Sequence, residues 1–190
     1  MIYILFFINA VSIGFGNQYL NKFYSFMDND KVLKFEITID QSQFNSNYIS
    51  EGDFYFVEDN HYIYDTKLKR LTFKNDQITT LNKVDRQILH ENTISETFSI
   101  FDIFKSKNKL INATKIKLIG QEIEIYFSIK ELSSSGSLII NATDGRPKLI
   151  KVSTEEKINI ELKIKSVTTS SKLKLKDIDT RQFNVIDLRG

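Results

Sequence analysis

The 190-residue sequence contains no cysteine and no tryptophan, and only one proline, seven glycines and two histidines. Without cysteine, the chain has no disulfide framework, thiolate metal site, cysteine nucleophile or lipid-modified N-terminal cysteine. So few prolines and glycines exclude a low-complexity or linker-rich chain. At this length the chain suits one domain with a hydrophobic core of its own.

Charge is nearly balanced, with 26 Lys and Arg against 24 Asp and Glu. The formal net charge of +2 does not indicate a nucleic-acid partner. Aromatic residues are abundant, with 15 Phe and 8 Tyr. Such an excess must either fill a core or line a cavity for an apolar ligand, and the composition alone does not choose between them.

The N-terminus has the features of an export signal. Residues 2–11 form an apolar run about as long as the hydrophobic region of a signal peptide and too short to span a bilayer. Gly14 and Gly16 supply the small residues that a signal peptidase reads, although no Lys or Arg precedes the run. We expect residues 1–16 to be a removed signal peptide and residues 17–190 to form the mature domain. A buried first strand or helix is the alternative.

Two segments carry apolar residues at the helical period of about 3.6 residues. They span residues 18–27 and 95–105, and the second begins with Ser95 as a predicted N-cap and Glu96 in the first turn. Each predicted helix has an apolar side that must be buried against the rest of the fold. The apolar positions are Tyr19, Leu20, Phe23, Phe26 and Met27 in the first segment and Phe98, Phe101 and Phe104 in the second.

Most of the chain from Val32 onward alternates apolar and polar residues with the period of β-strands. A polar loop over residues 41–47 and a turn over residues 133–136 interrupt this pattern. The sequence therefore predicts a mainly β, antiparallel sheet of about ten strands, which must curl, close or split. The expected strand segments are 32–40, 48–57, 61–65, 69–74, 77–82, 86–90, 110–119, 122–130, 137–143, 148–154, 157–167 and 182–187.

Residues 52–87 organise the chain as a meander of short strands with one apolar face. Phe54 and Phe56 point to one side of their strand, whereas Asp53, Tyr55 and Val57 point to the other. Gly52 indicates a bulge or a close approach of two backbones.

Residue chemistry gives little support for catalysis. His61 and His90 fall on different predicted strands without partners at ligand spacing, so we expect no metal site and no cofactor. No nucleophile elbow or phosphate-binding glycine loop occurs. A hydrolase would require a carboxylate pair on the apolar face, and we expect a protein that is not an enzyme. The carboxylates in the central region are Asp53, Glu58, Asp59, Asp65, Asp85 and Glu91.

Near the C-terminus, lysines alternate with leucines at Leu173 and Leu175. This pattern predicts an outer strand edge guarded by lysine, with a polyanion or membrane-surface contact as the alternative. The lysines are Lys172, Lys174 and Lys176.

The order of several short motifs resembles the LolA family of periplasmic lipoprotein carriers. The resemblance spans residues 17–188 and includes a Gly-x-aromatic-x-aromatic strand, an aromatic-x-aromatic strand, a strand ending in a polar turn, a polar segment leading to glutamine, a later Asp-Gly hairpin and a closing strand. These motifs are Gly52–Phe56, Tyr62–Tyr64, Leu71–Asp76, Asn82–Gln87, Ser134–Lys151 and Phe183–Asp187.

The resemblance implies an unclosed, strongly curved antiparallel half-barrel whose concave face is covered by short helices. Its cavity would bind lipid, with Tyr62 at the position of the family's lipid-contacting phenylalanine. The implied lining residues are Phe35, Ile37, Phe54, Phe56, Tyr62 and Tyr64, and the implied lid residues are Phe23, Phe26, Phe98 and Phe101.

The implied activity is transport in the periplasm. A monomeric carrier would accept an acylated lipoprotein from an inner-membrane ABC transporter and pass it to an outer-membrane lipoprotein receptor. A periplasmic sensor of lipids or lipoproteins, or another apolar-ligand module with no transfer role, is the alternative.

Two positions depart from the family pattern. Glu58 stands where family members carry the arginine that ties the lid to the strands, and Asn82-Lys83 replaces an Asn-Pro pair. Arg70 and Arg86 are the candidates to replace the missing arginine. We hypothesise that Glu58 loosens the lid.

Overall fold

The computed structural model describes residues 18–28, 30–44, 46–93, 98–106, 110–129, 133–154 and 158–189. The predicted signal peptide over residues 1–16 lies outside these ranges, as do Ser95 and Glu96 at the start of the second predicted helix. In the described part of the chain, no helix is both long and apolar enough to cross a membrane.

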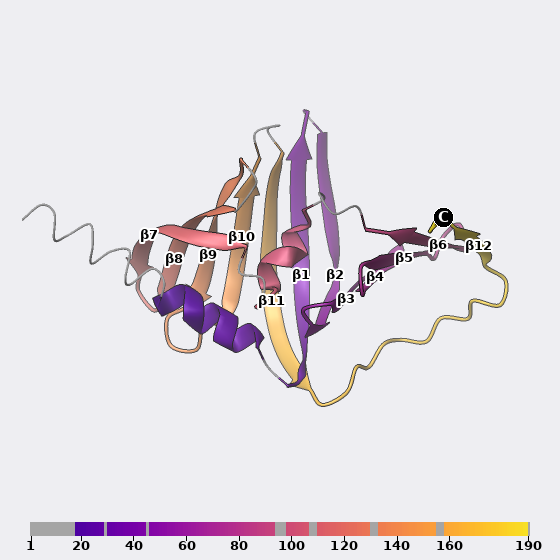
Figure 1. The fold of residues 1–190 in the computed structure, drawn as a ribbon, viewed down its shortest axis with the longest axis horizontal. Coiled ribbons are helices and arrows are strands. Elements are labelled where there is room, and N and C mark those ends of the chain that lie inside the picture. Colours follow the sequence, from indigo (N-terminus) through magenta and orange to yellow (C-terminus); the bar gives the residue numbers. More distant parts are fainter. Residues whose placement is uncertain are drawn as a thin grey trace, which may run out of the picture. The chain divides into compact units, whose positions relative to one another are not determined.

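Within these ranges, twelve strands form one open sheet in the order β12-β6-β5-β4-β3-β2-β1-β11-β10-β9-β8-β7 (Figure 1). β12 pairs parallel with β6, whereas β2 to β6 and β7 to β11 pair antiparallel along the chain. The predicted class, a mainly β and unclosed sheet of the half-barrel type, is confirmed. The strands are β1 (Val32–Gln43), β2 (Ser46–Glu58), β3 (His61–Thr66), β4 (Lys69–Lys74), β5 (Gln77–Asn82), β6 (Gln87–Asn92), β7 (Ile111–Ile119), β8 (Glu122–Ile129), β9 (Ser135–Asn141), β10 (Pro147–Ser153), β11 (Asn159–Ser170) and β12 (Asn184–Asp187).

Contacts between Cα atoms divide the chain into two compact units. Unit 1 comprises Met1–Asp28, Ile39–Ile49 and Ile100–Ile164. Unit 2 comprises Asn29–Thr38, Ser50–Ser99 and Lys165–Gly190. The long strands β1, β2 and β11 therefore contribute residues to both units.

Unit 1 has an apolar core formed by alternate residues of β8 to β11. Ile125 of β8 lies opposite Leu138 of β9, and Leu138 lies opposite Ile150 of β10. Ile150 in turn lies opposite Leu162 of β11. All four side chains are fully buried, so this row excludes water from one face of four adjacent strands.

The helix over residues 18–27, coloured indigo in Figure 1, is confirmed and packs within unit 1. The ring of Phe23 is fully buried and its centroid lies 6.2 Å from that of Phe104. Lys22 Nζ donates a hydrogen bond of 2.8 Å to the carbonyl oxygen of Ala142, in the turn between β9 and β10. Leu20, Phe23 and Met27 of the predicted apolar stripe are buried, whereas Tyr19 and Phe26 are partly buried.

The second predicted helix is shorter and tighter than expected. Its described part contains a 3₁₀-helix, η1 (Ile100–Phe104), which ends before Lys105. A 3₁₀-helix has about three residues per turn, so side chains three apart lie on one side. The spacing of Phe101 and Phe104 suits this geometry better than the α-helical period, and both rings are buried.

Two segments predicted as loop or turn are largely strand. β1 continues to Gln43 and β2 resumes at Ser46, within the predicted loop over residues 41–47. β9 begins at Ser135, within the predicted turn over residues 133–136, and pairs with β8 and β10. Backbone pairing holds these polar and small residues in strands although their side chains show no apolar alternation.

Replacing Gly145 by alanine should destabilise the protein by more than about 3 kcal/mol. Gly145 has φ 75° and lies so close to the Lys22 carbonyl that an added Cβ would overlap it. Gly120 is the matched control, because its φ is 60° but no atom lies within 4 Å of an added Cβ. Gly120→Ala should lower the free energy of unfolding by only about 1 kcal/mol, the cost of holding an alanine in the left-handed backbone conformation. Urea unfolding measures the stability of both variants. Equal losses of stability in Gly145→Ala and Gly120→Ala would contradict the close contact between the helix and the β9–β10 turn.

Candidate functional site

Unit 2 presents a set of aromatic side chains on one face of β1 to β4, which we call the aromatic face: Phe35, Phe54, Phe56, Tyr62, Tyr64 and Phe73. Strand register brings them together. Phe54 lies opposite Tyr64 and Phe56 opposite Tyr62 across β2 and β3, and Tyr62 lies opposite Phe73 across β3 and β4. Adjacent strands therefore place their rings side by side.

The rings of the aromatic face form a continuous chain across the four strands. The centroids of Phe35 and Phe54 are 5.7 Å apart, and those of Phe54 and Tyr62 are 5.8 Å apart. Tyr62 stacks on Phe73 at 4.7 Å with an interplanar angle of 8°. Offset and tilted ring pairs at such distances contribute about 1 kcal/mol each beyond their buried area.

The aromatic face is covered in this structure. Phe35, Ile37 and Phe54 expose none of their surface, Phe56 exposes 3%, Tyr64 4% and Tyr62 8%. The Tyr64 hydroxyl and the Ser50 hydroxyl lie 2.8 Å apart in a hydrogen bond, and burial raises the pKa of Tyr64. The face is therefore apolar and uncharged, which suits a hydrocarbon ligand, but a ligand would have to displace packed side chains.

The ten predicted lipid-binding residues are divided between the units. The six lining residues lie in unit 2, and Phe35, Phe54 and Tyr62 are in direct ring contact. Of the predicted lid residues, Phe23, Phe26 and Phe101 belong to unit 1 and Phe98 to unit 2. Phe73 was not among the predicted site residues, yet it extends the chain of rings. Its alternation with Leu71 on a strand beside the aromatic-x-aromatic motif was the available signal.

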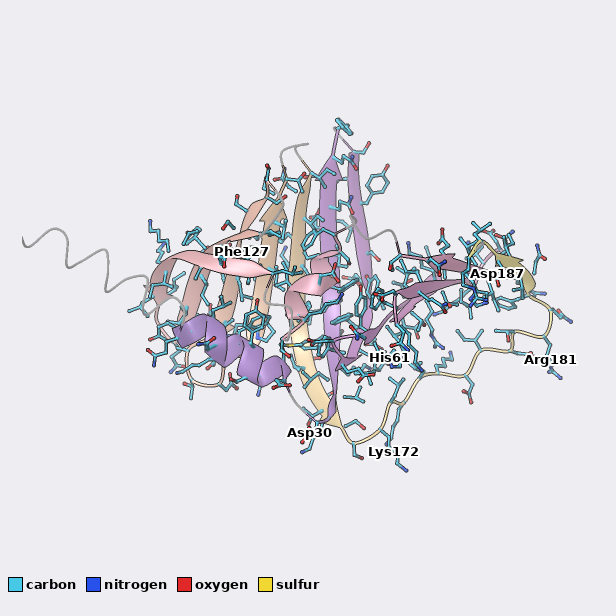
Figure 2. All side chains as sticks on the ribbon, in the orientation of Figure 1. Asp30, His61, Phe127, Lys172, Arg181 and Asp187 are labelled. Carbon is cyan, nitrogen blue, oxygen red and sulfur yellow. The ribbon has the colours of Figure 1, made fainter. Side chains whose placement is uncertain are left out.

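The opposite face of β2 is buried around Tyr55 and not exposed to solvent. Tyr55 is only 7% exposed and clusters with Val32 and Ile63. Leu173 and Leu175 pack against this cluster. They come from residues 171–183, here called the C-terminal segment, which runs from β11 to β12 and carries Lys172 and Arg181 (Figures 1 and 2).

The C-terminal segment contains no strand before β12 in the described residues. The prediction of a lysine-guarded strand edge over residues 172–176 is therefore wrong. The alternation of lysine and leucine arises because the leucines pack on the sheet while the lysines remain exposed.

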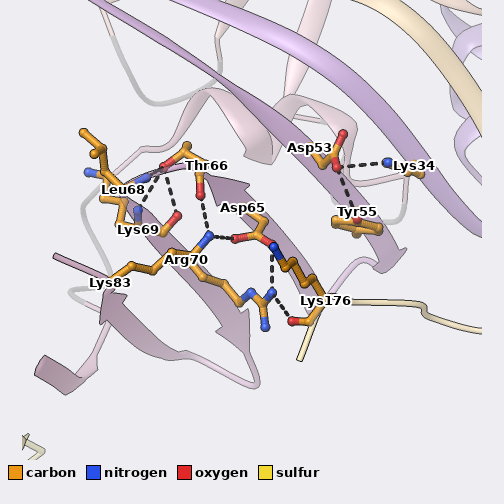
Figure 3. A network of polar contacts seen from close by, with 10 residues as sticks. All are labelled: Lys34, Asp53, Tyr55, Asp65, Thr66, Leu68, Lys69, Arg70, Lys83 and Lys176. Atoms are coloured by element: carbon orange, nitrogen blue, oxygen red, sulfur yellow. Dashed lines mark hydrogen bonds and ion pairs between the residues drawn. The ribbon is translucent and has the colours of Figure 1, made fainter. Parts of the chain in front are cut away.

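Arg70 fixes this segment through a polar network around Asp65 (Figure 3). The Asp65 carboxylate accepts from Arg70 Nη2 at 2.8 Å and from Lys83 Nζ at 2.6 Å. Arg70 Nη2 also donates to the carbonyl oxygen of Lys176 at 2.8 Å, and Lys83 Nζ donates to the carbonyl oxygen of Thr66.

Arg86 likewise binds the C-terminal segment, donating to Gln182 Oε1 at 3.1 Å. Arg70 and Arg86 thus anchor this segment, and the expectation that one of them replaces the family's lid arginine is not supported by these contacts. Glu58, the residue at that position, is exposed at the end of β2.

His90 and Asp53 each have a side-chain partner. His90 Nδ1 is 3.0 Å from Thr79 Oγ1, and burial lowers the pKa of His61, with nearby Lys74 acting in the same direction. Asp53 pairs with Lys34 at 2.9 Å. Across the described part of the chain, no group of three His, Asp or Glu side chains is placed to hold a metal ion.

Neither the protein-family models nor the curated proteins include a match to this sequence. Similar solved structures do exist. An uncharacterised conserved protein from Thermus thermophilus matches 90% of this chain and 98% of its own, with a TM-score of 0.58 at 6% identity. The two proteins share a fold. At this identity the likeness concerns the fold alone.

Weaker matches include a LolA superfamily protein from Nitrosomonas europaea, with a TM-score of 0.45 and 9% identity over 89% of this chain and 97% of that one. The complex of Pseudomonas aeruginosa MucA and MucB also matches, with a TM-score of 0.45 and 8% identity over 90% of this chain and 64% of that one.

Asp65→Asn should destabilise the protein in a pH-dependent way. Burial acts to raise the pKa of Asp65, but the hydrogen bonds and charges of Arg70 and Lys83 outweigh it and hold the pKa below its usual value. The stabilisation is therefore complete above the unfolded pKa of about 3.9 and is lost as the pH falls through the lower folded pKa.

At a pH near 7, we expect the free energy of unfolding of the wild type to exceed that of Asp65→Asn by about 2 kcal/mol. The difference should disappear in strongly acidic buffer. Urea unfolding of both proteins across this range measures it. A difference that is constant with pH would show that the carboxylate charge is not what stabilises the network.

Proposed function

We propose that this protein is a periplasmic carrier that binds the acyl chains of lipoproteins on its aromatic face and moves them from the inner to the outer membrane. The supporting observation is the continuous chain of rings across β1 to β4, on a face with no charged side chain among its members. The order of LolA-like motifs supports the same assignment. In this role the protein acts without catalysis or cofactor, as a monomer.

Its proposed partners follow from this role. Acylated lipoproteins would be the cargo, an inner-membrane ABC lipoprotein transporter the donor and an outer-membrane lipoprotein receptor the acceptor. Export through a removed signal peptide would place the protein between them.

The energies involved permit a covered face to open. Burial of an acyl chain contributes about 0.8 kcal/mol per methylene, so one long chain supplies on the order of 10 kcal/mol. The three ring contacts of the aromatic face contribute about 1 kcal/mol each beyond their area. A bound acyl chain can therefore replace these ring contacts with a net gain in free energy. The free-energy cost of opening the face lowers the affinity enough to permit release.

The protein should bind a synthetic triacylated lipopeptide and not the same peptide without acyl chains. Tyr62→Glu should weaken binding more than about tenfold, because it places a charge in the apolar face. Tyr48→Glu is the matched control, since Tyr48 is 64% exposed at the start of β2. Fluorescence anisotropy of a labelled lipopeptide measures the affinities.

Because Tyr62→Glu can also impair folding, the wild-type protein provides a second readout. A photoreactive acyl chain should crosslink to peptides from β1 to β4. Crosslinks confined to other strands, or equal binding of the non-acylated peptide, would refute the proposed site. Binding of the lipopeptide without delivery to acceptor vesicles or receptor would instead indicate a lipid-binding module with no transfer role.

Glu58→Arg should slow the release of bound lipopeptide, because it restores the charge that closes the lid in the LolA family. Asp177→Arg is the control, with the same charge change at another exposed position of unit 2. Stopped-flow transfer to acceptor vesicles measures the rates. An unchanged release rate in Glu58→Arg would eliminate the hypothesis that Glu58 loosens the lid.

A further inference from the structure

Unit 1 contains a groove of about 650 Å³ on the polar face of its sheet. The volume is in the range of small-molecule sites. Tyr126 of β8, Ser137 of β9, Lys151 of β10 and Glu161 of β11 line it. These residues are adjacent in sequence to the buried core positions of the same strands, so they point to the opposite face.

The groove follows from the strand register. Tyr126 lies opposite Ser137, Ser137 opposite Lys151, and Lys151 opposite Glu161, which makes one row across four strands. A second row joins Ser135, Ser153 and Asn159, which lie two residues further along their strands. The serines are short and the flanking side chains are long, and this difference in length hollows the sheet surface.

The floor of the groove carries unused hydrogen-bonding capacity. Ser137 lines this floor and is 7% exposed, so its short side chain lies deep in the groove. Ser153 Oγ donates to Asn159 Oδ1 at 2.7 Å, which leaves the Asn159 amide nitrogen able to donate to a ligand.

The charges at the groove balance, because Lys151 and Lys163 are matched by Glu161 and by Asp40, which also lines the groove and interacts with Lys163. Lys151 and Lys163 both pair with Glu161 at 2.9 Å, and these hydrogen bonds lower the pKa of Glu161. A charged ligand would have to break these pairs, whereas a neutral ligand would not. The Tyr126 ring adds an aromatic surface, and its hydroxyl donates to Glu124 Oε2 at 2.9 Å.

We propose that this groove binds a neutral oligosaccharide, with serine and asparagine side chains bonding its hydroxyls and the Tyr126 ring contacting its C–H surface. An extended peptide fits less well. β8 to β10 have a neighbour on each side, so their backbone groups are paired in the ladder and offer no strand edge to a peptide. The proposal is independent of the carrier function, because the groove and the aromatic face lie in different units.

The test titrates the intact protein with maltotriose, cellotriose and triacetylchitotriose, using amide NMR chemical shifts. At least one trisaccharide should give saturable shifts at Ser137, Lys151 and Ser153. Tyr126→Ala and Asn159→Ala should each weaken binding about tenfold or more. Tyr48→Ala and Asn112→Ala, exposed residues of unit 1 outside the groove, should bind as wild type does.

The proposal is overturned if none of the three sugars gives saturable shifts. It is also overturned if both groove variants bind as wild type does, or if a polar peptide saturates the groove and the sugars do not. Wild-type shifts that map to unit 2 would exclude this groove even if a variant fails to fold.

Discussion

The packing of β1 to β4 in unit 2 depends on the chain of ring contacts across these strands. Each ring is placed by the register of its own strand, so the contacts of Phe54 with Tyr62 and of Tyr62 with Phe73 exist only if the strands pair as observed. Under the proposed function, the rings that fill this core would also be the apolar surface that contacts the ligand. The ligand would then have to replace contacts that the free protein makes with itself.

The reverse side of the same strands explains why residues 54–56 of β2 are buried on both faces. Leu173 and Leu175 cover Tyr55, while the Asp65–Arg70 pair holds the backbone of Lys176. A charged network at the margin of an apolar contact fixes the position of a segment that has no strand of its own.

Side-chain periodicity was sufficient to predict the class of fold and several elements. The strands over residues 69–74 and 77–82 have the predicted bounds, because each is bounded by turn residues. Periodicity failed where backbone pairing or distant packing decides structure. Ser135 and Gly136 have no apolar signal, yet they pair on both sides. The burial of Tyr55 depends on leucines more than one hundred residues later in the sequence, which no local pattern reveals.

Native mass spectrometry of the protein purified from the periplasm, followed by organic extraction, tests the central claim most directly. A carrier should arrive with an acylated ligand, and removal of that ligand should leave a folded protein able to take up added lipoprotein. A protein that carries no lipid as isolated and takes up none would contradict the account, and the aromatic face would then be a filled core with no role in transport.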